Sequence, residues 1–371
     1  MRKRVLEVIR QGQIGGGESH LLDLVDLMSK EEVEPVVLSF TTGEMVRRLT
    51  AMGIRCHVIE SLRAFDLRVT RQVEQLLRDE HIDMVHAHGS RAASNMLMPA
   101  RRLHLPLLYT VHGWSFHDDQ SPVVFRLRAW SERLLCRQAT AVICVSQSNA
   151  DTGLRRCGLR EAVVIENGVN LRRFDAQAVP TVLRTTLGFG QDDVVAGFVG
   201  RCTKQKSPLD FLAAVAKAHG RDERVKALFV GEGDMDAEVD AYIRSQQMES
   251  YVCRQPFRTD VPELLQAMDI YCLPSLWEGL SIGLLEAMAM GKAVVATPTD
   301  GTREVIRHEE NGLTVPFGDA DGLCQAILRL AADAALRQRC GQAAVSLVCQ
   351  RFNAQTTADR TLQVYRKILK R

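Results

Sequence analysis

The chain has 371 residues, of which 46% are hydrophobic and 25% are charged, and its formal net charge is +2. A single hydrophobic core seldom supports a chain of this length, so we expect two domains. The small net charge gives no field strong enough to indicate a nucleic-acid partner.

The sequence carries no mark of a secreted or membrane-spanning protein. Its basic start is followed by a short apolar run, VLEVI, which is too short for a signal peptide. No segment approaches the roughly 20 apolar residues of a membrane helix. The ten cysteines occur singly, with no C-x-x-C pair, so we expect free thiols in a reducing compartment. We therefore expect a cytoplasmic enzyme or binding protein.

The first half of the chain alternates short apolar segments with amphipathic ones. The apolar segments, which we interpret as buried strands, are residues 4–9, 35–40, 56–59, 84–87, 107–111 and 141–145. A glycine-rich turn at 12–17 leads into a segment with helical spacing at 18–28, and a second helix is expected at 44–52. This alternation predicts a parallel sheet with helices on both faces.

The second half repeats the pattern after a weakly periodic stretch at 176–192, which we interpret as the linker. Apolar strands are expected at 194–199, 225–230, 269–273 and 293–296, with a helix at 209–219. A glycine-led loop, GRCTKQKSP, follows the first of these strands. Two doubly wound α/β domains are therefore predicted. Ligands of such sheets bind at the carboxyl ends of the strands, and a cleft between two domains is a natural site.

Two glutamates stand among small and apolar residues in the segment SLWEGLSIGLLEAMAM, residues 275–290. The glycines in this segment argue against one helix through both, so we expect Glu278 in a loop and a helix that begins near Ser281, its N-cap. Glu286 then lies in the early turns, beside N–H groups that suit a phosphate. Its carboxylate could accept hydrogen bonds from two neighbouring hydroxyls, as on a ribose. The alternative is that Glu278 is a solvated loop residue and that Glu286 only interacts with the dipole of the helix.

The segment EGLSIGLLE resembles the E-x7-E pattern of retaining glycosyltransferases with the GT-B fold, glycosyltransferase family 4. Further segments resemble this family in order along nearly the whole chain. They are GGGE at 15–18, VHAHGS at 85–90, TVHG at 110–113, VSQSNA at 145–150, IENGVNLRRF at 165–174, VGRCTKQKSP at 199–208, AMAMGKAVVATPTDGTREVI at 287–306 and NGLTVP at 311–316. Each is a moderate match alone, and together they form a strong one.

The resemblance implies two Rossmann-like doubly wound domains that face a cleft, with a C-terminal helix that crosses back to the first domain. We accordingly expect an N-terminal, acceptor-side domain at 1–175 together with 356–371. The nucleotide-sugar-binding domain is expected at 193–355.

The resemblance also implies a retaining enzyme that moves a sugar from a nucleotide-diphosphate sugar to a glycan or lipid-linked acceptor, in cell-surface polysaccharide or lipopolysaccharide synthesis. Arg201 and Lys206 would stabilise the charge that develops on the leaving diphosphate, without a metal. Outside that context, the same loop would be interpreted as a solvated basic segment. The family usually has glycine after this lysine, whereas this chain has Ser207, which leaves the conformation of the loop open.

The remaining donor contacts follow from the same resemblance. Gly16 and Gly17 would let the backbone approach the diphosphate closely, although a plain tight turn is the simpler interpretation of the glycines. Glu278 would accept hydrogen bonds from hydroxyls of the donor sugar, Glu286 would hold the ribose, and His112 would contact the donor sugar. Main-chain groups of Gly279, Leu280 and Ser281 would touch the sugar and the phosphate.

Several side chains raise the question of a metal. His86 and His88 point to one side of a strand and could bind zinc, but the sequence reveals no third ligand. We expect His88 to line the site and His86 to lie in the core. His117, Asp118 and Asp119 fall in a segment that predicts a loop before a helix. We expect no metal and no cofactor, since the nucleotide-sugar is the donor substrate. The leaving phosphate would take the acceptor proton, so no general base is nominated.

Residues 125–138 predict a helix with four arginines, Phe125 and Trp130. A basic helix with aromatic residues can lie on an anionic membrane, although such a stripe is more often a solvated face. We expect a cytoplasmic protein, and peripheral contact with an anionic membrane is a hypothesis beside the solvated face. The alternatives are a catalytically silent GT-B partner subunit, a GT-B nucleotide-sugar epimerase and a sugar-binding protein without catalysis. UDP, GDP and ADP donors all fit the motifs.

Overall fold

The structure is a computed structural model that describes residues 2–370. The chain forms two compact units. The first comprises residues 2–168 and 354–370, and the second comprises Val169–Asn353. No helix within residues 2–370 is long and apolar enough to cross a membrane.

The first unit is built on a seven-stranded parallel sheet with the order β3-β2-β1-β4-β5-β6-β7. Its strands are β1 (Lys3–Ile9), β2 (Val33–Ser39), β3 (Arg55–Val58), β4 (Met84–His88), β5 (Leu107–Val111), β6 (Ala141–Cys144) and β7 (Val163–Val164). Its helices are α1 (Gly16–Leu27), α2 (Glu44–Ala51), α3 (Thr70–Asp79), α4 (Ser90–Arg102), α5 (Pro122–Gln138), α6 (Gln147–Arg156) and α15 (Ala354–Leu369).

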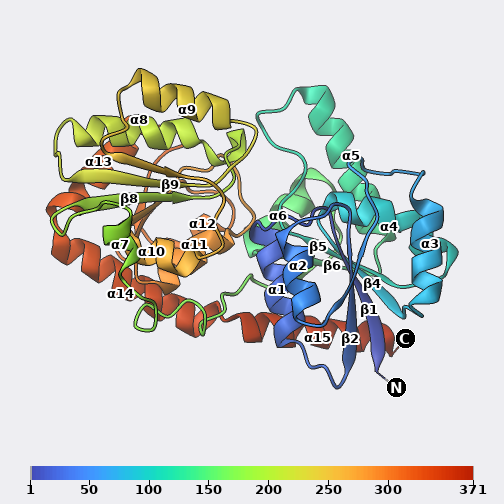
Figure 1. The fold of residues 1–371 in the computed structure, drawn as a ribbon. Helices are drawn as coiled ribbons and strands as arrows, with labels where there is room; N and C mark the ends of the chain where they lie inside the picture. Colours follow the sequence, from blue (N-terminus) through green and yellow to red (C-terminus); the bar gives the residue numbers. More distant parts are fainter. Residues whose placement is uncertain (1, 371) are drawn as a thin grey trace. The chain divides into compact units, whose positions relative to one another are not determined.

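Successive residues of β1 supply the cores on the two faces of this sheet. Leu6 packs with residues of α3 and α4, whereas Val5 packs with Leu24 of α1 and Leu362 of α15. This follows from the alternation of side chains along a strand. Figure 1 shows α15 running beside α1. The C-terminal helix is therefore part of the first unit, as the resemblance implied.

The second unit contains a six-stranded parallel sheet with the order β10-β9-β8-β11-β12-β13. Its strands are β8 (Val194–Val199), β9 (Val225–Val230), β10 (Val252–Gln255), β11 (Ile270–Leu273), β12 (Ala293–Ala296) and β13 (Leu313–Thr314). Its helices are α7 (Leu183–Thr186), α8 (Pro208–His219), α9 (Asp236–Ser245), α10 (Val261–Ala267), α11 (Ile282–Ala289), α12 (Thr302–Val305), α13 (Ala320–Ala332) and α14 (Ala334–Arg351), with a short 3-10 helix at Lys204–Lys206. In Figure 1, α8, α9 and α13 lie on one side of this sheet and α10 and α11 on the other.

The strand order reverses direction once in each sheet. The chain runs outward from β1 through β2 to β3 and then returns to β4 on the other side of β1. It likewise runs from β8 through β9 to β10 and returns to β11. Such switch points leave room for a ligand beyond the carboxyl ends of the two central strands. The glycine-rich turn at 12–17 follows β1, and the loop GRCTKQKSP follows β8.

The boundary between the units falls at Gly168 and Val169. Residues 176–192, which we predicted as a linker, lie within the second unit. Arg184 of α7 forms an ion pair with Asp269 at 2.9 Å and donates to the carbonyl oxygen of Ala267. Phe189 is buried. These contacts attach the segment to the second unit.

Candidate active site

Two loops of the second unit carry the predicted charged residues and are joined by direct contacts. The loop after β8 holds Lys206, whose Nζ lies 2.5 Å from Oε1 of Glu278 in the loop after β11. Gln205 strengthens the junction, because its side chain donates to the carbonyl oxygen of Trp277 and its own carbonyl oxygen accepts from the N–H of Leu276. The structure therefore brings Lys206 and Glu278 together.

Arg201 lies two residues beyond the end of β8 and is half-buried. Within residues 2–370 its guanidinium makes no side-chain hydrogen bond or ion pair. It is therefore a positive charge at the carboxyl edge of the sheet that no carboxylate neutralises. A guanidinium can bind two oxygens of one phosphate group.

The structure shows how the loop accommodates Ser207 at the position where the family usually has glycine. Ser207 adopts a left-handed conformation, with φ 50° and ψ 54°, which glycine adopts at little cost. Its hydroxyl donates to Oδ2 of Asp210 at 2.6 Å. The loop therefore keeps a backbone conformation typical of glycine although the residue is serine.

Helix α11 begins as the sequence predicted. Ser281 is its N-cap, and its hydroxyl accepts from the N–H of Leu284. Glu286 lies in the second turn and is half-buried. Burial raises the pKa of Tyr271, and the charges of Glu286 and Glu278 raise it further. Both carboxylates therefore act on one phenol, whose hydroxyl donates to the carbonyl oxygen of Val199 at the end of β8.

Backbone packing between glycines fixes the loops of this region, which the sequence did not reveal. A Cβ atom on Gly301 would lie 2.0 Å from the carbonyl oxygen of Gly279, in the loop that follows Glu278. A Cβ atom on Gly231 would lie 1.8 Å from the carbonyl oxygen of Gly200, next to Arg201. Neither place has room for a side chain.

In the first unit, the glycine-rich turn leads directly into α1. This helix begins at Gly16, which is exposed, and a Cβ atom on Gly16 would meet no atom of residues 2–370 within 4 Å. A Cβ atom on Gly17 would lie 3.7 Å from Cδ2 of His112. The predicted residues Gly17 and His112 are therefore neighbours at the carboxyl edge of this sheet.

His112 belongs to a cluster of imidazoles. Its Nε2 lies 3.1 Å from Nδ1 of His88, and its ring centroid lies 4.9 Å from that of His20. Burial lowers the pKa of His20 to about 3 and that of His88 to about 4, and it also lowers the pKa of His112 well below its ordinary value. All three rings are therefore neutral near pH 7.

The structure supplies third metal-ligand candidates that the sequence did not reveal. Nitrogens of His20, His88 and His112 all lie within 4.8 Å of one another, as do ligand atoms of Glu7, His86 and His88. His86 is a core residue, as expected, and hydrogen-bonds Tyr365 and Thr110. His88, which we expected to line the site, ends β4 but is buried, and its Nδ1 contacts Nε2 of His112.

The segment with His117, Asp118 and Asp119 is a loop before α5, as predicted. Asp118 is exposed and pairs with Arg156 of α6. Asp118 is therefore a surface residue that takes part in an ion pair.

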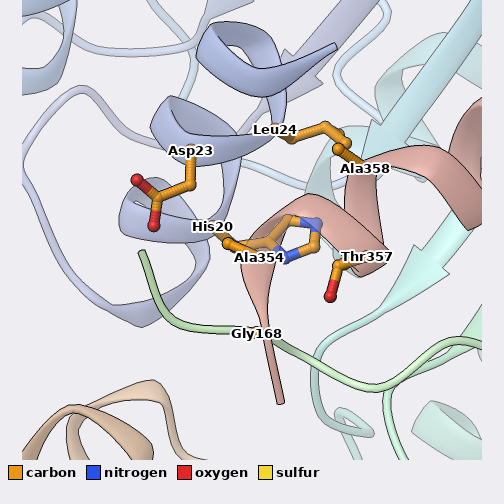
Figure 2. A pocket seen from close by; sticks show the side chains of 7 residues that line it. All are labelled: His20, Asp23, Leu24, Gly168, Ala354, Thr357 and Ala358. Atoms are coloured by element: carbon orange, nitrogen blue, oxygen red, sulfur yellow. The ribbon is translucent and has the colours of Figure 1, made fainter. Parts of the chain in front are cut away.

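A small pocket lies between α1 and the start of α15 (Figure 2). His20 and Asp23 of α1 and Thr357 of α15 line it, with Gly168 nearby. It has room for about one water molecule, which is too little for a substrate. His20 is the residue that this pocket shares with the imidazole cluster.

Two parallel sheets, each with a glycine-containing loop at its switch point, are typical of the GT-B class, and comparisons with known proteins agree. Residues 14–173 match the family described as Glycosyltransferase Family 4, and residues 193–333 match Glycosyl transferases group 1. The chain therefore belongs to glycosyltransferase family 4 and is a glycosyltransferase.

Individual proteins share moderate similarity with this chain. A UDP-Gal:alpha-D-GlcNAc-diphosphoundecaprenol alpha-1,3-galactosyltransferase of Escherichia coli is 27% identical over 73% of this chain and 72% of its own length. A phosphatidyl-myo-inositol mannosyltransferase of Mycobacterium leprae is 28% identical over 95% of this chain and 93% of its own length. The Anabaena protein HepE, solved in complex with UDP and glucose, superimposes with a TM-score of 0.87 at 23% identity, over 99% of this chain and 100% of its own.

Proposed function

We propose that this chain transfers a sugar, with retention, from a nucleotide-diphosphate sugar to a glycan or lipid-linked acceptor in the synthesis of a cell-surface polysaccharide or lipopolysaccharide. The observation that carries the proposal is the pairing of Lys206 with Glu278 beside the N-terminus of α11. This arrangement offers a cation, a carboxylate and backbone N–H groups at one switch point. Those are the groups that a sugar diphosphate requires.

In this proposal, the diphosphate binds Arg201 and Lys206, whose charges stabilise the leaving group as its bond to the sugar breaks. The diphosphate competes with Glu278 for Lys206, and Glu278 then accepts hydrogen bonds from hydroxyls of the sugar. N–H groups of Gly279, Leu280 and Ser281 contact the sugar and phosphate. The fixed side-chain charges take the part that a metal plays in other enzymes, so the reaction requires no metal.

Glu286 holds the ribose, and Gly16 and Gly17 contact the diphosphate. The leaving phosphate takes the proton of the acceptor hydroxyl. Two relatives support the assignment of substrates. The name of the Escherichia coli enzyme contains a UDP-sugar and a diphosphoundecaprenol acceptor, and that of the Mycobacterium leprae enzyme contains a phosphatidyl-inositol.

Thermal unfolding with UDP, GDP, ADP and CMP tests the donor site. One nucleotide is expected to raise the unfolding temperature, because a ligand that binds only the folded state stabilises it. Glu286→Ala should abolish the shift, since the ribose loses a charged hydrogen-bond acceptor worth about 1.5–3 kcal/mol. Glu263→Ala, which removes another half-buried helical glutamate of the same unit, should keep it. An unchanged affinity in Glu286→Ala would contradict the ribose assignment.

We also propose that α5 contacts an anionic membrane, which gives access to a lipid-linked acceptor. Val123, Leu127 and Trp130 are exposed and stand one turn apart on this helix. Exposed arginines at 126, 133 and 137 lie along one side of this stripe by helical spacing. An apolar stripe beside a row of cations suits the boundary between headgroups and acyl chains. The sequence had offered a solvated face as the alternative, and the exposed apolar side chains favour the membrane.

Flotation with anionic liposomes at low salt tests this contact. The protein is expected to float with the vesicles, and Leu127→Ser combined with Trp130→Ser should leave it at the bottom of the gradient. Leu154→Ser, which replaces an exposed leucine on α6, serves as the control and should float. A parent protein that stays at the bottom would exclude the membrane contact.

A further inference from the structure

Glu7 is a carboxylate at the centre of the first sheet, in the middle of β1, and its side chain is fully buried. Three donors surround it. Tyr365 of α15 donates to Oε1 at 2.6 Å, while Nε2 of His88 and Nδ1 of His86 lie 2.9 Å and 3.0 Å from Oε2. A buried carboxylate is stable only when it is paired in this way.

The protonation of Glu7 is determined by these neighbours. Burial alone would raise its pKa, but the charge of His86 and the hydrogen bonds from His86 and His88 outweigh burial and hold the pKa well below the ordinary value. Glu7 is therefore ionised and can only accept hydrogen bonds.

This acceptor determines where the protons of the next two rings lie. Because Glu7 carries no proton, the hydrogen bond to His88 requires the proton on Nε2 of His88. Since His88 is neutral, its Nδ1 then bears a lone pair and accepts from Nε2–H of His112, 3.1 Å away. His112 is left with an unprotonated Nδ1.

We propose that Glu7 and His88 are positioning residues that hold His112 in its Nε2-protonated tautomer, so that Nδ1 of His112 accepts a hydrogen bond from a hydroxyl of the donor sugar. The inference deepens the proposed function and rests on it for the identity of the sugar. The chain of hydrogen bonds runs from β1 through β4 to the residue that follows β5. These three strands are neighbours in the sheet, so the rings are fixed by the strands themselves.

A metal would use the same nitrogens in another way. If zinc were held by the two nitrogens that lie 3.1 Å apart, Nδ1 of His88 and Nε2 of His112, it would require a lone pair on Nε2 of His112, where the hydrogen bond requires a proton. The two arrangements therefore differ in the tautomer of His112, which can be measured.

The test is the ¹⁵N NMR spectrum of the full-length protein with labelled histidine, in which protonated and unprotonated ring nitrogens have well-separated shifts. The chain has ten histidines, and His112→Gln and His88→Gln assign the two signals. Both rings are expected to be protonated on Nε2 in the parent protein. A proton on Nδ1 of His112, or zinc that copurifies in stoichiometric amount and broadens or shifts these signals, would overturn the proposal.

Glu7→Gln provides the second arm. Its amide can donate to Nε2 of His88, which moves the proton of His88 to Nδ1 and that of His112 to Nδ1. We expect this reversal, together with a roughly tenfold rise in KM for the donor, as one lost hydrogen bond to the sugar implies. Glu132→Gln is the matched control, because Glu132 is equally buried in the same unit and accepts from Tyr109. It should leave both tautomers and KM unchanged.

The two readouts separate this inference from the proposed function. In one outcome, His112 is protonated on Nε2 in the parent protein, the tautomer reverses in Glu7→Gln, and no nucleotide-sugar binds. This outcome would support the role of Glu7 and His88 in fixing the tautomer but would contradict the proposed donor. In the other outcome, Glu7→Gln binds the donor normally and the tautomer of His112 does not change. This outcome would contradict the positioning role of Glu7 and leave the proposed glycosyltransferase function intact.

Discussion

Replacing Lys206 with alanine is expected to lower turnover by well over ~10-fold, because the leaving diphosphate loses a fixed positive charge. The substitution has a second effect. The side chains of Lys206 and Glu278 are only 15% and 10% exposed, so the change also leaves a largely buried carboxylate without its cation. Removal of one partner from a buried pair can cost about 3–5 kcal/mol, and partial exposure reduces that cost here. Turnover must therefore be compared at a temperature at which the variant is fully folded.

Two variants separate chemistry from folding. Lys204→Ala removes an exposed lysine from the same short 3-10 helix and should keep near-parental turnover. Lys206→Ala combined with Glu278→Gln removes the unpaired charge, so it should recover unfolding temperature without recovering turnover. Steady-state kinetics with the identified donor, alongside thermal melts, measures both. Near-parental turnover in folded Lys206→Ala would assign leaving-group stabilisation to another residue.

The central strands of both sheets could be predicted closely because they are buried on both faces. Residues 107–111, 194–199, 225–230 and 293–296 are mostly apolar, with Thr110 and Lys226 as the polar exceptions, and the structure gives these bounds for β5, β8, β9 and β12. Strand β10 was missed, because this edge strand reads VCRQ and carries polar side chains that a buried run does not. Strands β7 and β13 have only two residues each, too few to form a recognisable apolar run.

The residues of the candidate site could also be predicted only in part from the sequence. Lys206 and Glu278 could be nominated from local motifs, and the structure pairs them because their loops follow two adjacent strands, β8 and β11. The chain from Glu7 to His112 was not found, because it depends on which strands are neighbours. In the sequence, Glu7 is visible only as the charged residue within the apolar run VLEVI, and its partner Tyr365 is 358 residues away. A charged residue inside a strand does signal a buried partner, but only the topology identifies it.

Gly231→Ala is expected to destabilise the second unit by about 3 kcal/mol or more, the largest effect on stability that we predict. Gly231 has φ +137°, a conformation that other residues rarely adopt. Its added Cβ atom would also lie 1.8 Å from the carbonyl oxygen of Gly200, a backbone atom that cannot rotate away. The N–H of Gly200 donates to the carbonyl oxygen of Val230, so the loops after β8 and β9 would have to separate.

The two causes can be measured separately by urea unfolding. Gly188 has φ +85° and no atom of residues 2–370 within 4 Å of an added Cβ, so Gly188→Ala introduces the backbone strain without the clash. We expect Gly188→Ala to cost about 1–2 kcal/mol, clearly less than Gly231→Ala. Because Gly200 precedes Arg201, any folded Gly231→Ala protein should also lose nucleotide affinity, which Gly188→Ala should retain. Equal unfolding midpoints for the two variants would show that the loop after β8 moves freely. In that case, the close packing of Gly200 against Gly231 does not position Arg201.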